Sequence, residues 1–140
     1  YRKLVDEQKM SLEVAAFNIS LEEYGMYVIL TLPLGETSLA SLRDEIDEEI
    51  EKIQTNLISQ KDYEKLLNKF ESNFVSSNAS VEGIANSLAE YYIFYDDTNL
   101  INSEIDIYRS ITREEIRDVA KKYLNSNQRL TLNYLPGSKK

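Results

Sequence analysis

The sequence predicts an α+β fold in which helices cover one face of a small antiparallel or mixed β-sheet. Two stretches near the N-terminus and one near the C-terminus have apolar residues at every second position, which is the period of a strand. The long middle of the chain has them at spacings of three and four, the period of a helix. Because strands and helices are segregated along the chain, the pattern is typical of an α+β fold. No repeat or linker-like tract divides it, so residues 1–140 are expected to form a single domain.

The first part of the chain predicts a helix end followed by a β-hairpin. The helix-like pattern occupies the first ten residues, and alternation then runs over 12–20 and 26–34. Gly25 lies in the short link between the two runs, which indicates an antiparallel pair. Pro33 must lie at a strand end or on an edge, because proline cannot donate a ladder hydrogen bond.

The middle of the chain predicts a series of helices with recognisable starts. Apolar stripes recur over 39–57, 63–74, 81–92, 101–108 and 116–124. Thr37 or Ser38 can cap the first of these helices, and Ser59 with Asp62 has the spacing of a capping box for the second. Thr112 with Glu115 is a further capping box, which opens the last helix.

A final strand is expected over Arg129–Leu135, where Leu130, Leu132 and Tyr134 alternate with the residues between them. Where the helices cover the sheet, eleven side chains are predicted to be largely buried. They are Phe17, Leu30, Leu32, Ile46, Ile50, Ile53, Leu67, Phe70, Leu88, Val119 and Leu132.

The composition excludes several classes of function. The chain has a net charge of −8, so a nucleic-acid partner, which requires a basic surface, is not expected. No apolar run is long enough to span a membrane. The chain contains no histidine and no cysteine, so neither an ordinary zinc site nor a Ser-His-Asp or Cys-His arrangement can be built from it. We therefore assign no catalytic, cofactor-binding or metal-binding residue.

Four local features resemble binding or modification sites, and each has a structural interpretation. The acidic run over 44–51 is interpreted as the solvated face of a helix. The loop 96–99 lacks the spacing of an EF-hand and is interpreted as an Asx-capped turn. Of the aromatic cluster in 91–95, two members are expected inside and the rest at a rim that could bind a partner. The N-glycosylation patterns at Asn18 and Asn78 are common by chance and are discounted.

Taken in order, most of the chain resembles the second homologous domain of the M16 peptidase family, which includes pitrilysin, insulinase and the mitochondrial processing peptidase. The match is one of pattern and has no single diagnostic motif. The segments that carry it are LVDEQKMSLEVAAFNISLEEYGMYVILTLPLG, SLASLRDEIDEEIEKI, ISQKDYEKLLNKFESNFVSS, SVEGIANSLAEYYIFYDDTNLINSEIDIYRSIT and REEIRDVAKKYLNSNQRLTLNYLPG.

The resemblance implies a non-catalytic C-terminal domain of a zinc metallopeptidase, in which several such domains enclose a peptide substrate. It places zinc in the catalytic domain of the parent protein, on an HxxEH motif that nothing here matches. Active bacterial relatives often hold substrate with an Arg and a Tyr, and the corresponding positions here are near Val5 and Leu12, which cannot replace them. Whether the parent is an active zinc metalloendopeptidase stays open, as does its compartment, bacterial cytoplasm or periplasm.

The resemblance also predicts partners. The catalytic M16 domain, in the same chain or in a partner subunit, is the first of these, and peptide substrate is reached through the parent. The family domain has a strand and a helix before the point at which this chain begins, so a bare sheet edge and apolar surface near Leu12, Val14, Val28 and Leu30 are expected to cause self-association. Two alternatives are an inactive scaffold subunit of the same fold and an unrelated helical interaction module.

Overall fold

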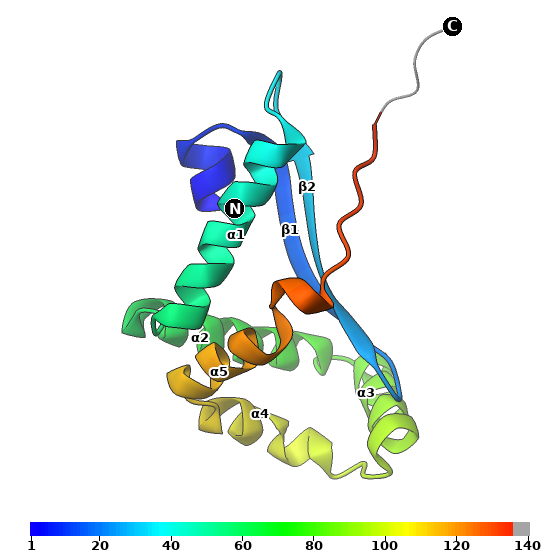
Figure 1. Ribbon diagram of the computed structural model, residues 1–140. Coiled ribbons are helices and arrows are strands. Elements are labelled where there is room, and N and C mark those ends of the chain that lie inside the picture. The colour runs from blue at the N-terminus through cyan, green and yellow to red at the C-terminus, as the bar shows by residue number, and fades with distance from the viewer. Residues whose placement is uncertain (136–140) are drawn as a thin grey trace, which may run out of the picture. The chain divides into compact units, whose positions relative to one another are not determined.

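The computed structural model describes residues 1–135 and shows the α+β class that the sequence predicts (Figure 1). The chain forms two compact units. The first contains Tyr1–Lys52 together with the chain from Tyr123 onward, and the second is Ile53–Lys122. Each unit is described by itself.

The first unit is built on an antiparallel hairpin. A π-helical turn, η1 (Arg2–Glu7), leads into strand β1 (Ser11–Ser20), which pairs with β2 (Gly25–Pro33). The predicted hairpin is confirmed, and Pro33 lies at the strand end where its missing N–H does no harm. At the turn, a Cβ on Gly25 would lie 2.6 Å from the carbonyl oxygen of Ile19, so only glycine fits there.

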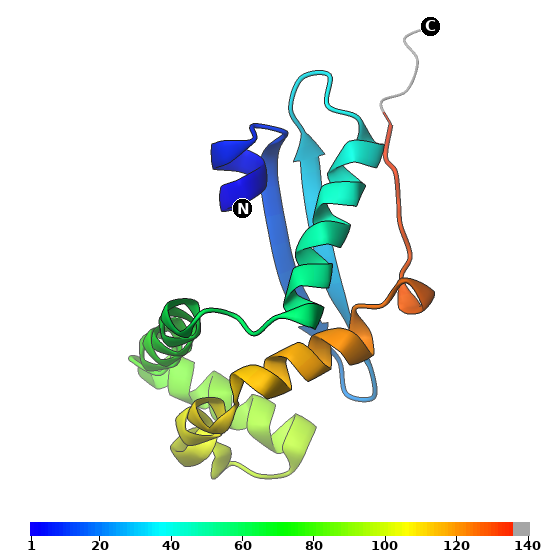
Figure 2. The ribbon, with the colours of Figure 1, turned by 60° about the vertical axis from the view of Figure 1, so that its left-hand side comes forward.

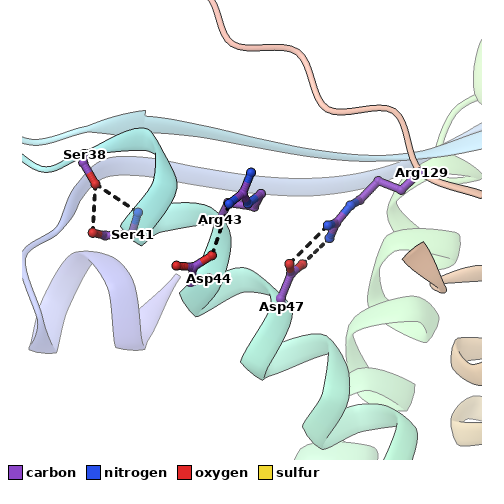
Figure 3. Close-up of polar contacts among 6 residues, drawn as sticks. All are labelled: Ser38, Ser41, Arg43, Asp44, Asp47 and Arg129. Carbon is purple, nitrogen blue, oxygen red and sulfur yellow. Dashed lines mark hydrogen bonds and ion pairs between the residues drawn. The ribbon is translucent and has the colours of Figure 1, made fainter. Parts of the chain in front are cut away.

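Helix α1 (Leu39–Thr55) follows the hairpin and runs beside it in both views (Figures 1 and 2). Its predicted cap is present, because the Ser38 hydroxyl accepts a hydrogen bond from the backbone N–H of Ser41 at 3.1 Å (Figure 3). Leu42 of α1, Leu4 of η1 and Ser11 at the start of β1 are the buried residues of this unit within 1–135. The Ser11 hydroxyl donates to the carbonyl of Leu32 at 2.6 Å, which satisfies its buried oxygen beside the bulge in β1.

The second unit is helical. Its helices are α2 (Gln60–Ser77), α3 (Val81–Tyr95), α4 (Leu100–Ser110) and α5 (Arg113–Tyr123), and a 3₁₀ turn, Ser126–Gln128, follows α5 in the chain. Helix α4 packs against both α2 and α3. The rings of Phe70 and Tyr108 stack at 4.8 Å between α2 and α4, and the Tyr63 hydroxyl donates to the Ile111 carbonyl at 2.5 Å.

Both predicted capping boxes are confirmed. The Ser59 hydroxyl accepts from the N–H of Asp62 at 3.1 Å, at the start of α2. At the start of α5 the exchange is reciprocal: the Thr112 hydroxyl accepts from the N–H of Glu115 at 3.1 Å, and the Glu115 carboxylate accepts from the N–H of Thr112 at 2.7 Å. That backbone hydrogen bond holds the pKa of Glu115 below its ordinary value, because it favours the charged form.

The predicted final strand is wrong. Residues 129–135 form no ladder with β1 or β2, and the side chains of Leu130, Leu132 and Tyr134 are 82–95% exposed. Alternation indicates which side chains would share a face, but a strand also needs a neighbouring strand that forms hydrogen bonds with its N–H and C=O groups. In the part of the chain that the structure describes, the sheet therefore has two strands rather than three.

The predicted core is also wrong. None of the eleven side chains is fully buried; Ile46, Ile50, Leu67 and Leu88 are half-buried and the other seven are exposed. On the face of the hairpin opposite to the predicted Leu30 and Leu32, Val14, Ile29 and Thr31 are half-buried; on the same face as Leu30 and Leu32, only the smaller Ala15 and Val28 are half-buried. A single helix beside a two-stranded sheet covers only one face of that sheet. In the second unit, each pair of packed helices buries only the side chains along their line of contact.

We predict that Gly83→Ala destabilises the corner between α2 and α3. An added Cβ would lie 1.8 Å from the Ser77 carbonyl oxygen, so the corner must open at a cost of about 1–3 kcal/mol. Without that clash alanine would stabilise the helix by roughly 0.8–1.0 kcal/mol, so the sign of the change is diagnostic. Thermal and urea unfolding followed by circular dichroism give the measurement, and Asn86→Ala, at an exposed position of the same helix, is the control. A gain in stability for Gly83→Ala would contradict the packing described here.

Candidate functional site

The most strongly interacting polar cluster of the first unit joins η1 to α1. The Lys3 ammonium lies 2.5 Å from a carboxylate oxygen of Glu45, 3.3 Å from one of Glu48 and 3.2 Å from one of Glu49. Lys52 lies 2.6 Å from Glu49, which extends the cluster along the helix. One lysine thus meets three carboxylates on successive positions of one helix face, an arrangement that holds the N-terminal turn against α1.

The pKa values of Lys3, Glu45 and Glu49 are shifted in the directions that mutual pairing requires. The pKa of Lys3 is raised, chiefly by its contact with Glu45. The pKa of Glu45 is lowered, chiefly by Lys3, and that of Glu49 is lowered, chiefly by Lys52. Since the charged form of each of these three residues is favoured by its partner, Lys3, Glu45 and Glu49 are all charged in the neutral pH range.

A second ion pair joins α1 to the C-terminal segment. Both terminal nitrogens of the Arg129 guanidinium donate to the carboxylate of Asp47, and the Nη2–Oδ2 distance is 3.1 Å (Figure 3). This bidentate geometry is the strong form of an arginine–carboxylate contact. The pair connects the start of the segment 129–135 to α1, although this segment forms no strand.

The acidic run over 44–51 is therefore only partly the solvated face that the sequence predicts. Asp44 and Glu48 are mostly exposed, whereas Glu45 and Asp47 are committed to Lys3 and Arg129. Sequence reasoning missed both pairs, because Lys3 and Arg129 lie 42 and 82 positions away from their partners in the chain. The cluster is a structural clamp, and no signal in the local sequence could have identified it.

The loop after α3 is the turn that was predicted. Asp96 has φ 51°, a left-handed cap that ends the helix. The Asp97 carboxylate accepts from the N–H of Asn99 at 2.9 Å, which is an Asx turn. Within residues 1–135 no group of three or more His, Cys, Asp or Glu side chains is placed to hold a metal ion.

The aromatic cluster at the end of α3 is more exposed than predicted. Tyr91 is half-buried, whereas Tyr92, Phe94 and Tyr95 are exposed, so one member rather than two faces inward. The Tyr91 hydroxyl donates to Glu104 of α4. The pKa of Tyr91 is raised, first by burial and then by this hydrogen bond, and the pKa of Tyr108 is raised by burial and by the same carboxylate. Glu104 is thus shared by two tyrosines, a contact that sequence spacing did not reveal.

The remaining positions singled out from the sequence have structural surroundings. Val5 is half-buried in η1, and Leu12 is 60% exposed on β1, so neither offers the charge or hydroxyl that a substrate-binding Arg–Tyr pair would supply. Asn18 donates to the Ser20 hydroxyl at 2.8 Å, and Asn78 caps α2 by donating to the Phe74 carbonyl at 3.0 Å. Over the described part of the chain, no helix has the length and apolarity needed to cross a bilayer.

The Lys3 cluster predicts a pH-dependent stability that Lys3→Met removes. Because the pKa values of Glu45 and Glu49 are lowered in the folded state, their ionised forms contribute to the free energy of unfolding above about pH 4.5. This contribution is lost as the pH falls through the folded-state pKa values. Because the pKa of Lys3 is raised in the folded state, the charged lysine contributes to the free energy of unfolding below about pH 10.5. This contribution is lost as the pH rises through the folded-state pKa. The melting temperature of Lys3→Met should therefore be lower than that of the wild type near pH 7, and the difference should shrink as pH falls below about 4.5. Lys69→Met, at an exposed position of α2, is the control; equal behaviour of the two variants would contradict the clamp.

The shared Glu104 predicts an ordered titration of the tyrosines. Because the pKa values of Tyr91 and Tyr108 are raised, these two should ionise after the exposed tyrosines in a spectrophotometric titration at alkaline pH. Their neutral forms stabilise the fold below about pH 10, and this contribution is lost as pH rises through the folded values. Glu104→Gln should bring the late step to lower pH, because the negative charge is gone. A titration in which all the tyrosines ionise together would contradict the cluster.

Comparison with known proteins identifies the fold. No family model matches the chain, and no curated protein matches it by sequence. Solved structures do match. A protease from Helicobacter pylori is similar over 90% of this chain and 30% of its own, with TM-score 0.81 and 19% identity. The inactive peptidase domain of a Bordetella parapertussis protein assigned as a zinc protease is similar over 95% of this chain and 71% of its own, with TM-score 0.82 and 19% identity.

The periplasmic protease PqqL from Escherichia coli also matches, over 88% of this chain and 14% of its own, with TM-score 0.71 and 18% identity. The chain thus spans less than a third of the first and third proteins. The predicted resemblance to M16 peptidases is confirmed at the level of the fold, and an unrelated helical module is excluded. The chain has the fold of a domain found in these proteases.

Proposed function

We propose that this chain is a non-catalytic C-terminal domain of an M16-type zinc metallopeptidase, which forms part of the wall of the chamber that encloses peptide substrates. The observation that carries the proposal is the match, over 95% of this chain, to a domain described as an inactive peptidase domain. The whole of residues 1–140 acts as one domain in this proposal. Peptide substrate is met in the assembled protein rather than by this chain alone.

The residues of the chain do not fit a catalytic zinc ion. A peptidase zinc takes imidazole and carboxylate ligands, and the chain has no histidine and no cysteine. We therefore place zinc in a separate catalytic domain, in the same polypeptide or in a partner subunit. No step of peptide hydrolysis is assigned to residues of this chain.

A second candidate is an inactive scaffold subunit of the same fold, which acts only in assembly. The description of the Bordetella domain as inactive favours it equally. The two differ in the rest of the parent: an HxxEH motif elsewhere in the reading frame makes the parent a peptidase, and its absence from every subunit favours the scaffold. Self-association of the chain, which its sequence leads us to expect, stays a prediction.

We predict that the isolated chain binds no stoichiometric zinc and cleaves no peptide. Neither the ligands nor a metal-bound water can be assembled from its residues. Elemental analysis of the dialysed chain and a fluorogenic peptide assay give the measurement. The control adds the catalytic domain from the same reading frame, which should bring zinc and activity that depend on both components. One tightly held zinc per isolated chain would contradict the proposal.

A further inference from the structure

We propose that one face of the β1–β2 hairpin is a docking surface for a basic amphipathic helix that belongs to another domain of the assembled protein. The inference rests on the proposed function, because it takes the partner from the same assembly. From residue 13 onward the register pairs odd-numbered residues of β1 with even-numbered residues of β2, and such residues share one side of the sheet. The large apolar side chains on that side define the hairpin face: Phe17, Ile19, Met26, Leu30 and Leu32.

The hairpin face is apolar and open within the first unit. Its five side chains are between 37% and 55% exposed. On the opposite side of the hairpin, by contrast, Val14, Ile29 and Thr31 are half-buried. Contiguous exposed apolar side chains on a folded domain mark a surface that binds something. The apolar character alone does not say what binds, so the occupant has to be identified from the charges around the face.

The hairpin is acidic and contains no basic residue. Over residues 11–34 its charged residues are Glu13, Glu22 and Glu23, and neither lysine nor arginine occurs there. Glu13 lies opposite Leu32 at one end of the hairpin face, and the two other acids lie in the turn beyond the opposite end. Among residues 1–135, none of the three forms an ion pair with a lysine or arginine. An apolar surface with an unpaired acid at each end is complementary to a partner with apolar residues between basic ends.

The net charge of the chain and its length select the source of that partner. A second copy also carries a net charge of −8 and would bring acids to the same acidic ends, so charge opposes it. The chain spans 30% of the Helicobacter protease and 14% of PqqL, so each of those proteins continues well beyond this domain. Another domain of the assembled protein is therefore the source to which we assign the basic partner.

The backbone of the partner should be helical. An extended segment laid across the hairpin face would press its unpaired N–H and C=O groups against apolar side chains, whereas a helix pairs these groups internally. Helices on the two faces of one sheet are also a common layer arrangement. From Glu13 to Ser20 the strand is about 24 Å long at roughly 3.4 Å per residue. A helix of about 16 residues has the same length at roughly 1.5 Å per residue, with basic residues near its two ends.

Binding of a designed helical peptide to the full chain tests the proposal. The probe is a fluorescein-labelled peptide of about 16 residues with a leucine stripe at spacings of three and four and lysines in its first and last turns. By fluorescence anisotropy at low salt, it should bind at least tenfold more tightly than the same peptide with glutamates in place of the lysines. A peptide of the same composition with the leucine stripe scrambled should also bind at least tenfold more weakly.

Variants of the chain place the binding on the hairpin face. Leu30→Ser should weaken the lysine peptide at least tenfold, whereas Val81→Ser, at an 86% exposed position of α3, should leave the affinity unchanged. Glu13→Gln should weaken it several-fold at low salt and less at high salt, because exposed charges are screened. Glu90→Gln, at an exposed position of α3, makes the same change in net charge and should have no effect. Circular dichroism checks that each variant is folded, and Glu13→Gln decides if Leu30→Ser is not.

Several results would overturn the proposal. These are no binding by the folded chain, equal affinity for the lysine and glutamate peptides, and equal effects of the hairpin variants and their controls. Sedimentation equilibrium in parallel covers the other occupant, since a dimer that Leu30→Ser disrupts would assign the hairpin face to a second copy. Each of these results leaves the proposed function intact. Zinc held by the isolated chain would instead overturn the proposed function, and the measured affinity for the peptide would remain.

Discussion

The first unit of this protein depends on the pairing of two antiparallel strands beside a single helix. The register from Ser11 to Ser20 against Gly25 to Pro33 decides which side chains share a face. One helix can cover only one face of such a pair, and it covers the half of the hairpin where Val14, Ile29 and Thr31 are half-buried. The opposite face keeps its large apolar side chains in solvent. The hairpin therefore exposes apolar side chains because only one of its two faces has a helix packed on it.

Long-range charge pairs stabilise the first unit where apolar packing is thin. Within the described residues its buried side chains are Leu4, Ser11 and Leu42, which is a small core. Lys3 of the N-terminal turn forms ion pairs with three carboxylates of α1, and Arg129 forms an ion pair with Asp47 of the same helix. Pairs of this kind contribute modestly in water and weaken with salt. The acidic face of α1 thus pairs both with the N-terminal turn and with Arg129.

The chemistry of the chain and its fold support the same conclusion. A chain without histidine or cysteine can neither hold a peptidase zinc nor build a nucleophile–imidazole pair. The same chain has the fold of a domain in proteases, one of which is described as an inactive peptidase domain. The fold alone does not imply a function, because function depends on the sites and surfaces that a fold carries. An assembly role is therefore the consistent proposal, and the apolar faces are where that role can be tested.

Local chemistry was enough to predict most of the elements. Ser38, Ser59 and the Thr112–Glu115 pair mark helix starts because their hydrogen bonds close within three residues, and the period-two runs mark the hairpin because strand geometry is local. The composition alone also excludes a zinc site built on histidine or cysteine ligands of this chain. The tertiary structure alone decided which hairpin face is covered and whether residues 129–135 pair with another strand. It also decided that Lys3, Arg129 and Glu104 contact residues distant in the sequence. Periodicity indicates which side chains share a face of a helix or strand. Burial and strand pairing depend instead on which other segment of the chain packs against that face or edge.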